Sequence, residues 1–299
     1  MTFTVNTVND ISDPSPDGIC DDGSGNCSLR EAVQEANANP GEDTVRFASC
    51  GSPVCVYLLS LGGVDEDDAA TGDLDVNDDL IVIGNGRGVT VVDGDAQDRV
   101  FELYTDPADP AIRVSLSGLT IRNGDATLGA NRQGGGVSFG ADNTENIFIF
   151  DEIEIAGNLA DEAGGVFLGL GTSTWTNCHI LGNTAAGALS VNGGGGVGII
   201  NGSHSFTDCV VDGNTATRGG GMTLSSQVEL DRVVLSRNRA ISADPFEGTG
   251  GGLYGAGGDP PISIRDSILR ENESSHDGGG ARIFGAFQIS GTTFQDNIS

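Results

Sequence analysis

The sequence contains no lysine, a single tryptophan and three tyrosines, and it has no apolar stretch long enough to form a membrane-spanning helix. So few aromatic side chains in 299 residues argue against a large core of the ordinary globular kind. All 14 basic residues are Arg, and 43 acidic residues outnumber them to give a net charge of −29. Because this charge repels phosphate, we do not expect nucleic acid as a partner.

Glycine is abundant, with 48 residues, and a repeat runs through the chain from about residue 115. Each repeat has an apolar residue, two variable residues and then Asn. The Asn positions lie 24 to 35 residues apart, which is typical of a solenoid whose loops vary in length. These asparagines are Asn123, Asn158, Asn183, Asn214, Asn238, Asn272 and Asn297.

The residues before each Asn alternate in character as in a β-strand. Positions three and five before it are mostly small or apolar, whereas the position two before it accepts charge, as at Asp212 and Arg270. A glycine cluster and a second apolar segment follow each Asn. We therefore expect an all-β fold, a right-handed parallel β-helix, in which the Asn residues adopt left-handed turns and stack ~4.8 Å apart as a hydrogen-bonded ladder.

One helix is expected, at about residues 28–39. Ser28 and Glu31 have the spacing of a capping box, an apolar stripe follows, and Pro40-Gly41 ends the segment. A short helix ahead of a solenoid can cover its exposed first coil. We assign residues 1–60 to an N-terminal cap with the first strands and residues 61–299 to the β-helix, which stops in mid-repeat. We also expect that a signal peptide has been removed.

The six cysteines fall into close pairs. Cys20 with Cys27 and Cys50 with Cys55 flank short loops, which favours local disulfides and an oxidising, extracellular compartment over a zinc site. Cys178 and Cys209 occupy equivalent positions in successive repeats. One strand spacing would suit either a disulfide or a stacked pair of buried thiols, and the sequence leaves both open.

The segment Cys27-Ser-Leu-Arg-Glu-Ala32 resembles the motif that names the CSLREA domain of bacterial and archaeal surface-exposed proteins. Residues 67–76 and 93–101 are similar to stretches that follow that motif. The later repeats more loosely resemble polymorphic outer-membrane autotransporter adhesins, although only Phe294 to Asn297 matches their Phe-x-x-Asn form. The resemblance implies a right-handed β-helix in a secreted or anchored protein and says little about activity.

Acidic residues concentrate near the cap. Carboxylate oxygens suit calcium, so these segments are either structural calcium sites or solvated acidic loops, and no cofactor is otherwise required. The candidate ligands are Asp21, Asp22, Asp65, Asp67, Asp68, Asp73 and Asp75.

Two functions fit the sequence. A non-catalytic secreted or cell-surface role as an adhesin, stalk or matrix component is favoured, because the repeats show no catalytic residues. Its partners would be extracellular carbohydrate, cell-surface molecules or further copies of the chain. The alternative is a polysaccharide lyase or glycoside hydrolase, which would need outward carboxylates or Arg on neighbouring coils. Only Asp212 and Arg270 are charged at the outward position two before each Asn, and they lie two coils apart.

Overall fold

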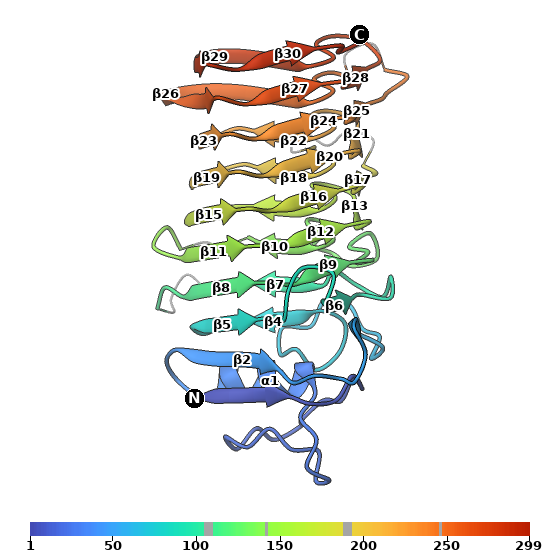
Figure 1. The fold of residues 1–299 in the computed structure, drawn as a ribbon, viewed down its shortest axis with the longest axis vertical. Helices are drawn as coiled ribbons and strands as arrows, with labels where there is room; N and C mark the ends of the chain where they lie inside the picture. The colour runs from blue at the N-terminus through green and yellow to red at the C-terminus, as the bar shows by residue number, and fades with distance from the viewer. Residues whose placement is uncertain (105–109, 141–142, 188–192, 245–246) are drawn as a thin grey trace.

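The computed structural model describes residues 1–104, 110–140, 143–187, 193–244 and 247–299. The chain winds into stacked coils, and each strand pairs in parallel with the strand one coil away (Figure 1). The protein is therefore an all-β parallel solenoid with one helix at its N-terminal end. No helix in the described residues is long and apolar enough to cross a membrane.

The largest sheet covers two faces of the solenoid, which join at β26 (Leu253–Arg265) and β29 (Ala281–Ser290). The long-strand face contains β1 (Thr2–Val5), β2 (Asp43–Phe47), β5 (Leu80–Ile83), β8 (Arg113–Ser117), β11 (Ile147–Asp151), β15 (Thr172–Thr176), β19 (Ser203–Thr207) and β23 (Gln227–Asp231). The short-strand face contains β4 (Leu74–Val76), β7 (Phe101–Leu103), β10 (Val137–Phe139), β14 (Val166–Leu168), β18 (Val197–Ile199) and β22 (Met222–Leu224).

Two narrower sheets complete the coils. The first contains β3 (Cys55–Leu58), β6 (Thr90–Asp93), β9 (Thr120–Arg122), β12 (Glu154–Ala156), β16 (His179–Leu181), β20 (Val210–Asp212), β24 (Val234–Ser236), β27 (Ile268–Arg270) and β30 (Thr293–Gln295). The second contains β13 (Leu159–Ala160), β17 (Thr184–Ala185), β21 (Thr215–Ala216), β25 (Arg239–Ala240) and β28 (Glu273–Ser274).

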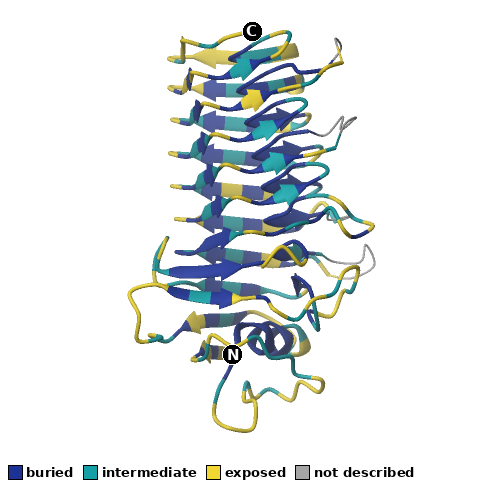
Figure 2. Cartoon of the chain, turned by 90° about the vertical axis from the view of Figure 1, so that its right-hand side faces the viewer, coloured by how far each residue is buried: buried dark blue, intermediate teal, exposed yellow. Residues whose placement is uncertain are grey.

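The core is a stack of like positions from successive coils. Alternate strand residues face inward, and burial is greatest in the strands of the inner coils, while the N-terminal loop, the outer turns and the last coil, with β29 and β30, are exposed (Figure 2). On the long-strand face Trp175 lies between Phe150 and Phe206, with ring centroids 3.7 and 5.5 Å apart and nearly parallel planes. In-register pairing thus lets the scarce aromatic residues pack against one another.

Six of the seven expected asparagines form the ladder, which we call the Asn ladder. The backbone N–H and Nδ2 of each donate to Oδ1 of the next; from Asn183 to Asn214 these bonds are 2.8 and 3.0 Å. Nδ2 of Asn183 also donates to the carbonyl of Ile155, 3.0 Å away. Bonds from each Asn to the next extend the ladder from Asn158 to Asn297.

The assignment of Asn123 to the ladder was wrong by one residue. Strand β9 pairs Ile121 with Ile155, so Gly124 takes the ladder position and donates to Oδ1 of Asn158 at 2.9 Å. A Cβ at Gly124 would lie 1.9 Å from the carbonyl oxygen of Gly135, so no side chain fits there. The shift also buries Ile121, which was expected to face water.

The left-handed turn residue is also not the ladder Asn. Positive φ belongs to the residue directly before it, and Asn123, with φ of 55°, occupies that preceding position in its own coil. Its Nδ2 donates to Asp93 at 3.0 Å. In the other coils, the residues with positive φ are Gly157, Gly182, Gly213, Arg237, Glu271 and Asp296.

Helix α1 (Leu29–Ala38) covers the N-terminal end of the solenoid, beside β1, β2 and β4 (Figure 1). The expected capping box is present: the Ser28 hydroxyl accepts from the Glu31 N–H, and the Glu31 carboxylate accepts from the Ser28 N–H. Polar as well as apolar helix residues are buried, because the loop before the helix packs over them. Carboxylate oxygens of Glu35, for instance, accept from the N–H groups of Asp17 and Gly18.

Disulfides join Cys20 to Cys27 and Cys50 to Cys55, as their spacing predicts. Cys178 and Cys209 are free and buried. Their thiols donate to the carbonyls of Thr176 and Thr207, at 3.2 and 3.3 Å, so the second of the two alternatives, a stacked pair of thiols, is the one present.

Candidate functional site

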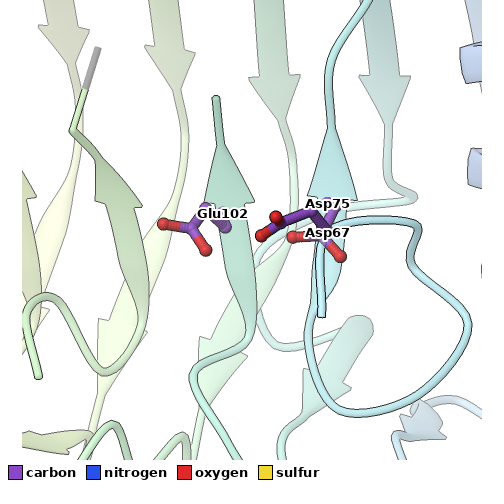
Figure 3. A group of neighbouring side chains, drawn as sticks. All are labelled: Asp67, Asp75 and Glu102. Carbon is purple, nitrogen blue, oxygen red and sulfur yellow. The ribbon is translucent and has the colours of Figure 1, made fainter. Parts of the chain in front are cut away.

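Three carboxylates converge on the short-strand face near the cap. Asp75 on β4 and Glu102 on β7 are cross-strand partners, and Asp67 approaches them from the preceding loop (Figure 3). One oxygen from each side chain lies within 4.8 Å of the others. We call Asp67, Asp75 and Glu102 the acidic cluster. It is the one such group of possible metal ligands in the part of the chain that the structure describes.

The strand pattern determines the positions of Asp75 and Glu102. Their apolar neighbours on either side face the core, so both carboxylates project from the outer surface of the sheet. Asp75 is nevertheless only 3% exposed, because the segment before β4 folds over it. The N–H of Ala69 in that segment donates to the Asp75 carboxylate at 2.8 Å.

Arg30 fastens this covering segment to the cap. Its guanidinium donates to the carbonyls of Ala69, Gly72 and Asp73 at 2.8 to 3.0 Å and forms an ion pair with Asp10 at 2.7 Å. The side chains of the pair are 0% and 2% exposed. The buried helix residue thus positions the loop that supplies Asp67.

Among the described residues, Arg99 is the cation that forms an ion pair with the acidic cluster, through Glu102. It lies 2.7 Å from Asp73 and 3.6 Å from Glu102, and it donates to the carbonyls of Asn131 and Gln133. The Asn131 amide donates to Glu102 at 3.0 Å. Arg99 is 3% exposed, so these contacts hold it inside the protein.

Burial dominates the electrostatics of the site. Desolvation raises the pKa of Asp75 to about 8 and that of Asp98 to about 6, and it also raises the pKa of Glu102. The pKa of Asp73 is raised well above its usual range, by burial first and then by the charge of Asp75. For Arg99 burial lowers the pKa, but the surrounding carboxylates outweigh it and the net shift is upward.

The structure brings together only two of the seven candidate calcium ligands, Asp67 and Asp75. Asp73 pairs with Arg99 instead, and Asp65 accepts from the N–H of Ala130 at 2.6 Å. Asp68 lies exposed outside the cluster.

Asp21 and Asp22 lie in a separate turn, before the helix. Asp21 accepts from the N–H groups of Gly23 and Gly25, and Asp22 accepts from Ser24 and Asn26. These hydrogen bonds shape the turn and lower the pKa of Asp22 to about 2. Both residues are separate from the acidic cluster.

Sequence reasoning missed Glu102 and Arg99. The signal was present, because Leu74-Asp-Val76 and Phe101-Glu-Leu103 share the same apolar-acidic-apolar pattern. Aligning these two segments as successive coils would have placed Asp75 beside Glu102.

A cleft of about 600 Å³ lies beside the cluster, with Asp67, Asp78, Asp79 and Tyr104 in its lining. Two of the carboxylates that line the cleft accept hydrogen bonds from the backbone. Asp78 accepts from the N–H of Gly41 at 3.1 Å, and Asp79 accepts from the N–H of Arg113 at 2.6 Å. Asp78 and Asp79 thus stabilise connections between separate segments of the chain.

A second polar cluster lies in the core. Ser173 on β15 and His204 on β19 are 2.8 Å apart (Oγ to Nδ1), and Trp175 Nε1 donates to the same Ser173 hydroxyl at 2.9 Å. His204 Nε2 lies 2.6 Å from the carbonyl oxygen of Asn201. Because Ser173 and His204 are 3% and 2% exposed, this is a satisfied buried network.

We expect His204 to contribute a loss of stability in mild acid. Burial lowers its folded-state pKa from 6.5 to about 4, so between these values the unfolded chain binds a proton that the folded protein does not. This contribution is intact above pH 6.5 and falls by about 3 kcal/mol as the pH approaches 4. Urea unfolding across this range measures it. Between pH 6.5 and 4 the wild type should lose about 3 kcal/mol relative to His204→Gln, whereas His276→Gln should follow the wild type; a constant difference between His204→Gln and the wild type would contradict the assignment.

No family model, curated protein or solved structure matches the chain. The resemblance of residues 27–32 to the CSLREA motif therefore has no support from these comparisons.

Proposed function

We propose that the chain is a non-catalytic protein of the cell surface or extracellular matrix, whose solenoid acts as a stalk or adhesive surface. We further propose that its coils wind in the right-handed sense, which nearly all parallel strand crossovers adopt. The main support is the continuous parallel pairing of its strands from β1 to β29 and from β3 to β30, with a register shift between Gly257 and Ile262 where β26 pairs with β29. Repeats that contact mainly their neighbours build a rod with long lateral surfaces.

The surface charges support this proposal. Many outward Arg residues pair with a carboxylate one coil away, as Arg232 does with Asp208 at 2.7 Å and Arg239 with Glu273 at 3.0 Å. Arg237 pairs with Asp212 and Arg265 with Glu229 in the same way. These charged groups are engaged with one another and connect successive coils.

An extracellular location fits the two local disulfides, which are typical of oxidising compartments. The CSLREA resemblance points in the same direction. The net charge of −29 opposes binding to nucleic acid and leaves carbohydrate or other cell-surface molecules as the proposed partners, together with self-association.

The polysaccharide-degrading alternative is less well supported. A lyase needs a base that can accept a proton, but Arg99 is buried and its pKa is shifted upward. A hydrolase needs carboxylates with access to a sugar, but Asp75 is covered and Glu102 is held by Asn131.

Incubation of the protein with pectin, alginate and glycosaminoglycans, with and without added calcium, distinguishes the non-catalytic function from the polysaccharide-degrading one. We expect no unsaturated products and no new reducing ends above a heat-denatured control. Depolymerisation that disappears in Glu102→Gln but persists in Glu145→Gln would establish the enzyme instead. Glu145 is a suitable control because it is an exposed carboxylate before β11.

A further inference from the structure

We propose that Asp67, Asp75 and Glu102 bind one divalent cation of the calcium type, which fastens the segment before β4 to the first coils of the short-strand face. This inference adds a binding site to the proposed scaffold and does not depend on the protein being a scaffold.

The first argument is the balance of buried charge. The buried Asp73, Asp75 and Asp98 and the partly buried Glu102 gather around a single guanidinium, that of Arg99, which is closest to Asp73. The other buried Arg of this region, Arg30, is paired with Asp10. Buried carboxylates without a counter-charge are costly, whereas a bound cation would compensate more than one of them.

The second argument is the geometry of the ligand atoms. Calcium binds oxygen at about 2.3 to 2.6 Å, so two oxygens on opposite sides of one ion lie about 5 Å apart. The three carboxylate oxygens of the cluster lie within 4.8 Å of one another and can therefore share one ion. The all-oxygen donor set favours a hard cation over zinc or copper.

The third argument comes from Ser138 on β10, and it does not rely on the positions of the carboxylates. Ser138 is the cross-strand partner of Glu102, so its side chain leaves the sheet on the same side as Asp75 and Glu102. It is 0% exposed, and its hydroxyl oxygen has no hydrogen-bond partner among the described residues. A buried hydroxyl without a partner is rare in proteins. A hydrated cation at the neighbouring carboxylates would provide a water for it.

Access and rigidity also suit a binding site. Asp67 is exposed, so an ion can reach the cluster from solvent. Asp75 and Glu102 are held in place by the Ala69 N–H and the Asn131 amide. Because the ligands come from a loop and two adjacent strands, binding would join three separate parts of the chain.

Calorimetric titration of the chelator-treated full chain with calcium tests the proposal. We expect one ion per chain and a higher melting temperature at saturating calcium, because the ion binds only the folded protein. Asp67→Asn should weaken binding at least tenfold, and because Asp67 is exposed this variant should fold normally. Glu102→Gln should weaken binding at least as much, and Glu145→Gln, a matched loss of one exposed charge, should bind as the wild type does.

Two results would overturn the proposal. One is the absence of binding to the wild type at millimolar calcium, which would mean that protons neutralise the cluster. The other is wild-type affinity in Asp67→Asn. Neither result would bear on the scaffold proposal, whose test is the polysaccharide assay.

Discussion

Replacing Arg30 by Lys is expected to reduce the free energy of unfolding by about 3–5 kcal/mol, because several buried acceptors lose their donor and each unsatisfied group costs about 1–3 kcal/mol. Lys carries the same charge but cannot reproduce the planar group that contacts Asp10 and the carbonyls of Ala69, Gly72 and Asp73. The Asp10 side chain, which is only 2% exposed, would lose its well-oriented partner. The carbonyls of Ala69, Gly72 and Asp73 would lose their donors. Urea unfolding monitored by circular dichroism measures the loss.

The matched control is Arg239→Lys. Arg239 pairs with Glu273 between coils, but the two side chains are 55% and 46% exposed, so solvent screens the pair. We expect a change below about 1 kcal/mol there. Equal effects at the two positions would show that Arg30 does not support the cap. The calcium binding that we propose for the acidic cluster should also weaken in the Arg30 variant, because Arg30 holds the segment that carries Asp67.

Asn214→Ala should cost about 3–5 kcal/mol of stability. Asn214 lies within the Asn ladder and is 0% exposed. Its Oδ1 accepts two bonds from Asn183, and its Nδ2 donates to Asn238 and to the carbonyl of Ile180. Alanine would remove all four hydrogen bonds and leave buried groups of Asn183, Asn238 and Ile180 with fewer partners. Each unsatisfied group costs about 1–3 kcal/mol.

Two variants sharpen this test. Asn214→Asp has nearly the same shape but cannot donate to Asn238 or Ile180, so it should be at least as destabilising as alanine. Asn201→Ala removes an exposed amide and should change stability by less than about 0.5 kcal/mol. Chemical denaturation compares the three proteins, and a loss below about 1 kcal/mol for Asn214→Ala would contradict a structural role for the ladder.

The repeat could be predicted from the sequence because each coil carries the same local pattern. Inward apolar residues, the Asn and the glycine cluster recur in every turn, and the capping box is contained in residues 28–31. Local spacing likewise predicted the disulfides of Cys20 with Cys27 and Cys50 with Cys55. These features depend on neighbours in the chain.

The errors arose where coils contact one another. Asn123 matches the repeat motif, yet the pairing of β9 with β12 and the close approach of Gly135 to Gly124 shift it out of the ladder. The density of acidic residues in the sequence favoured Asp21 and Asp68 as calcium ligands. The acidic cluster instead contains Glu102, which lies 27 positions after Asp75. Its position depends on the register between coils of unequal length, which composition alone does not give.

The Asn ladder also gives the solenoid a direction. From Asn158 to Asn272, Nδ2 of each ladder Asn donates to Oδ1 of the Asn one coil nearer the C-terminus, so these amide-to-amide bonds run head to tail and each polarises the next. Nδ2 also donates to a carbonyl of the preceding coil, as from Asn183 to Ile155. A coil slipped by one residue would remove an amide from this column and turn its inward side chains outward. A reversed coil would place donor against donor. The column therefore selects parallel stacking in a single register, and the one-residue shift at Asn123 lies where the column begins.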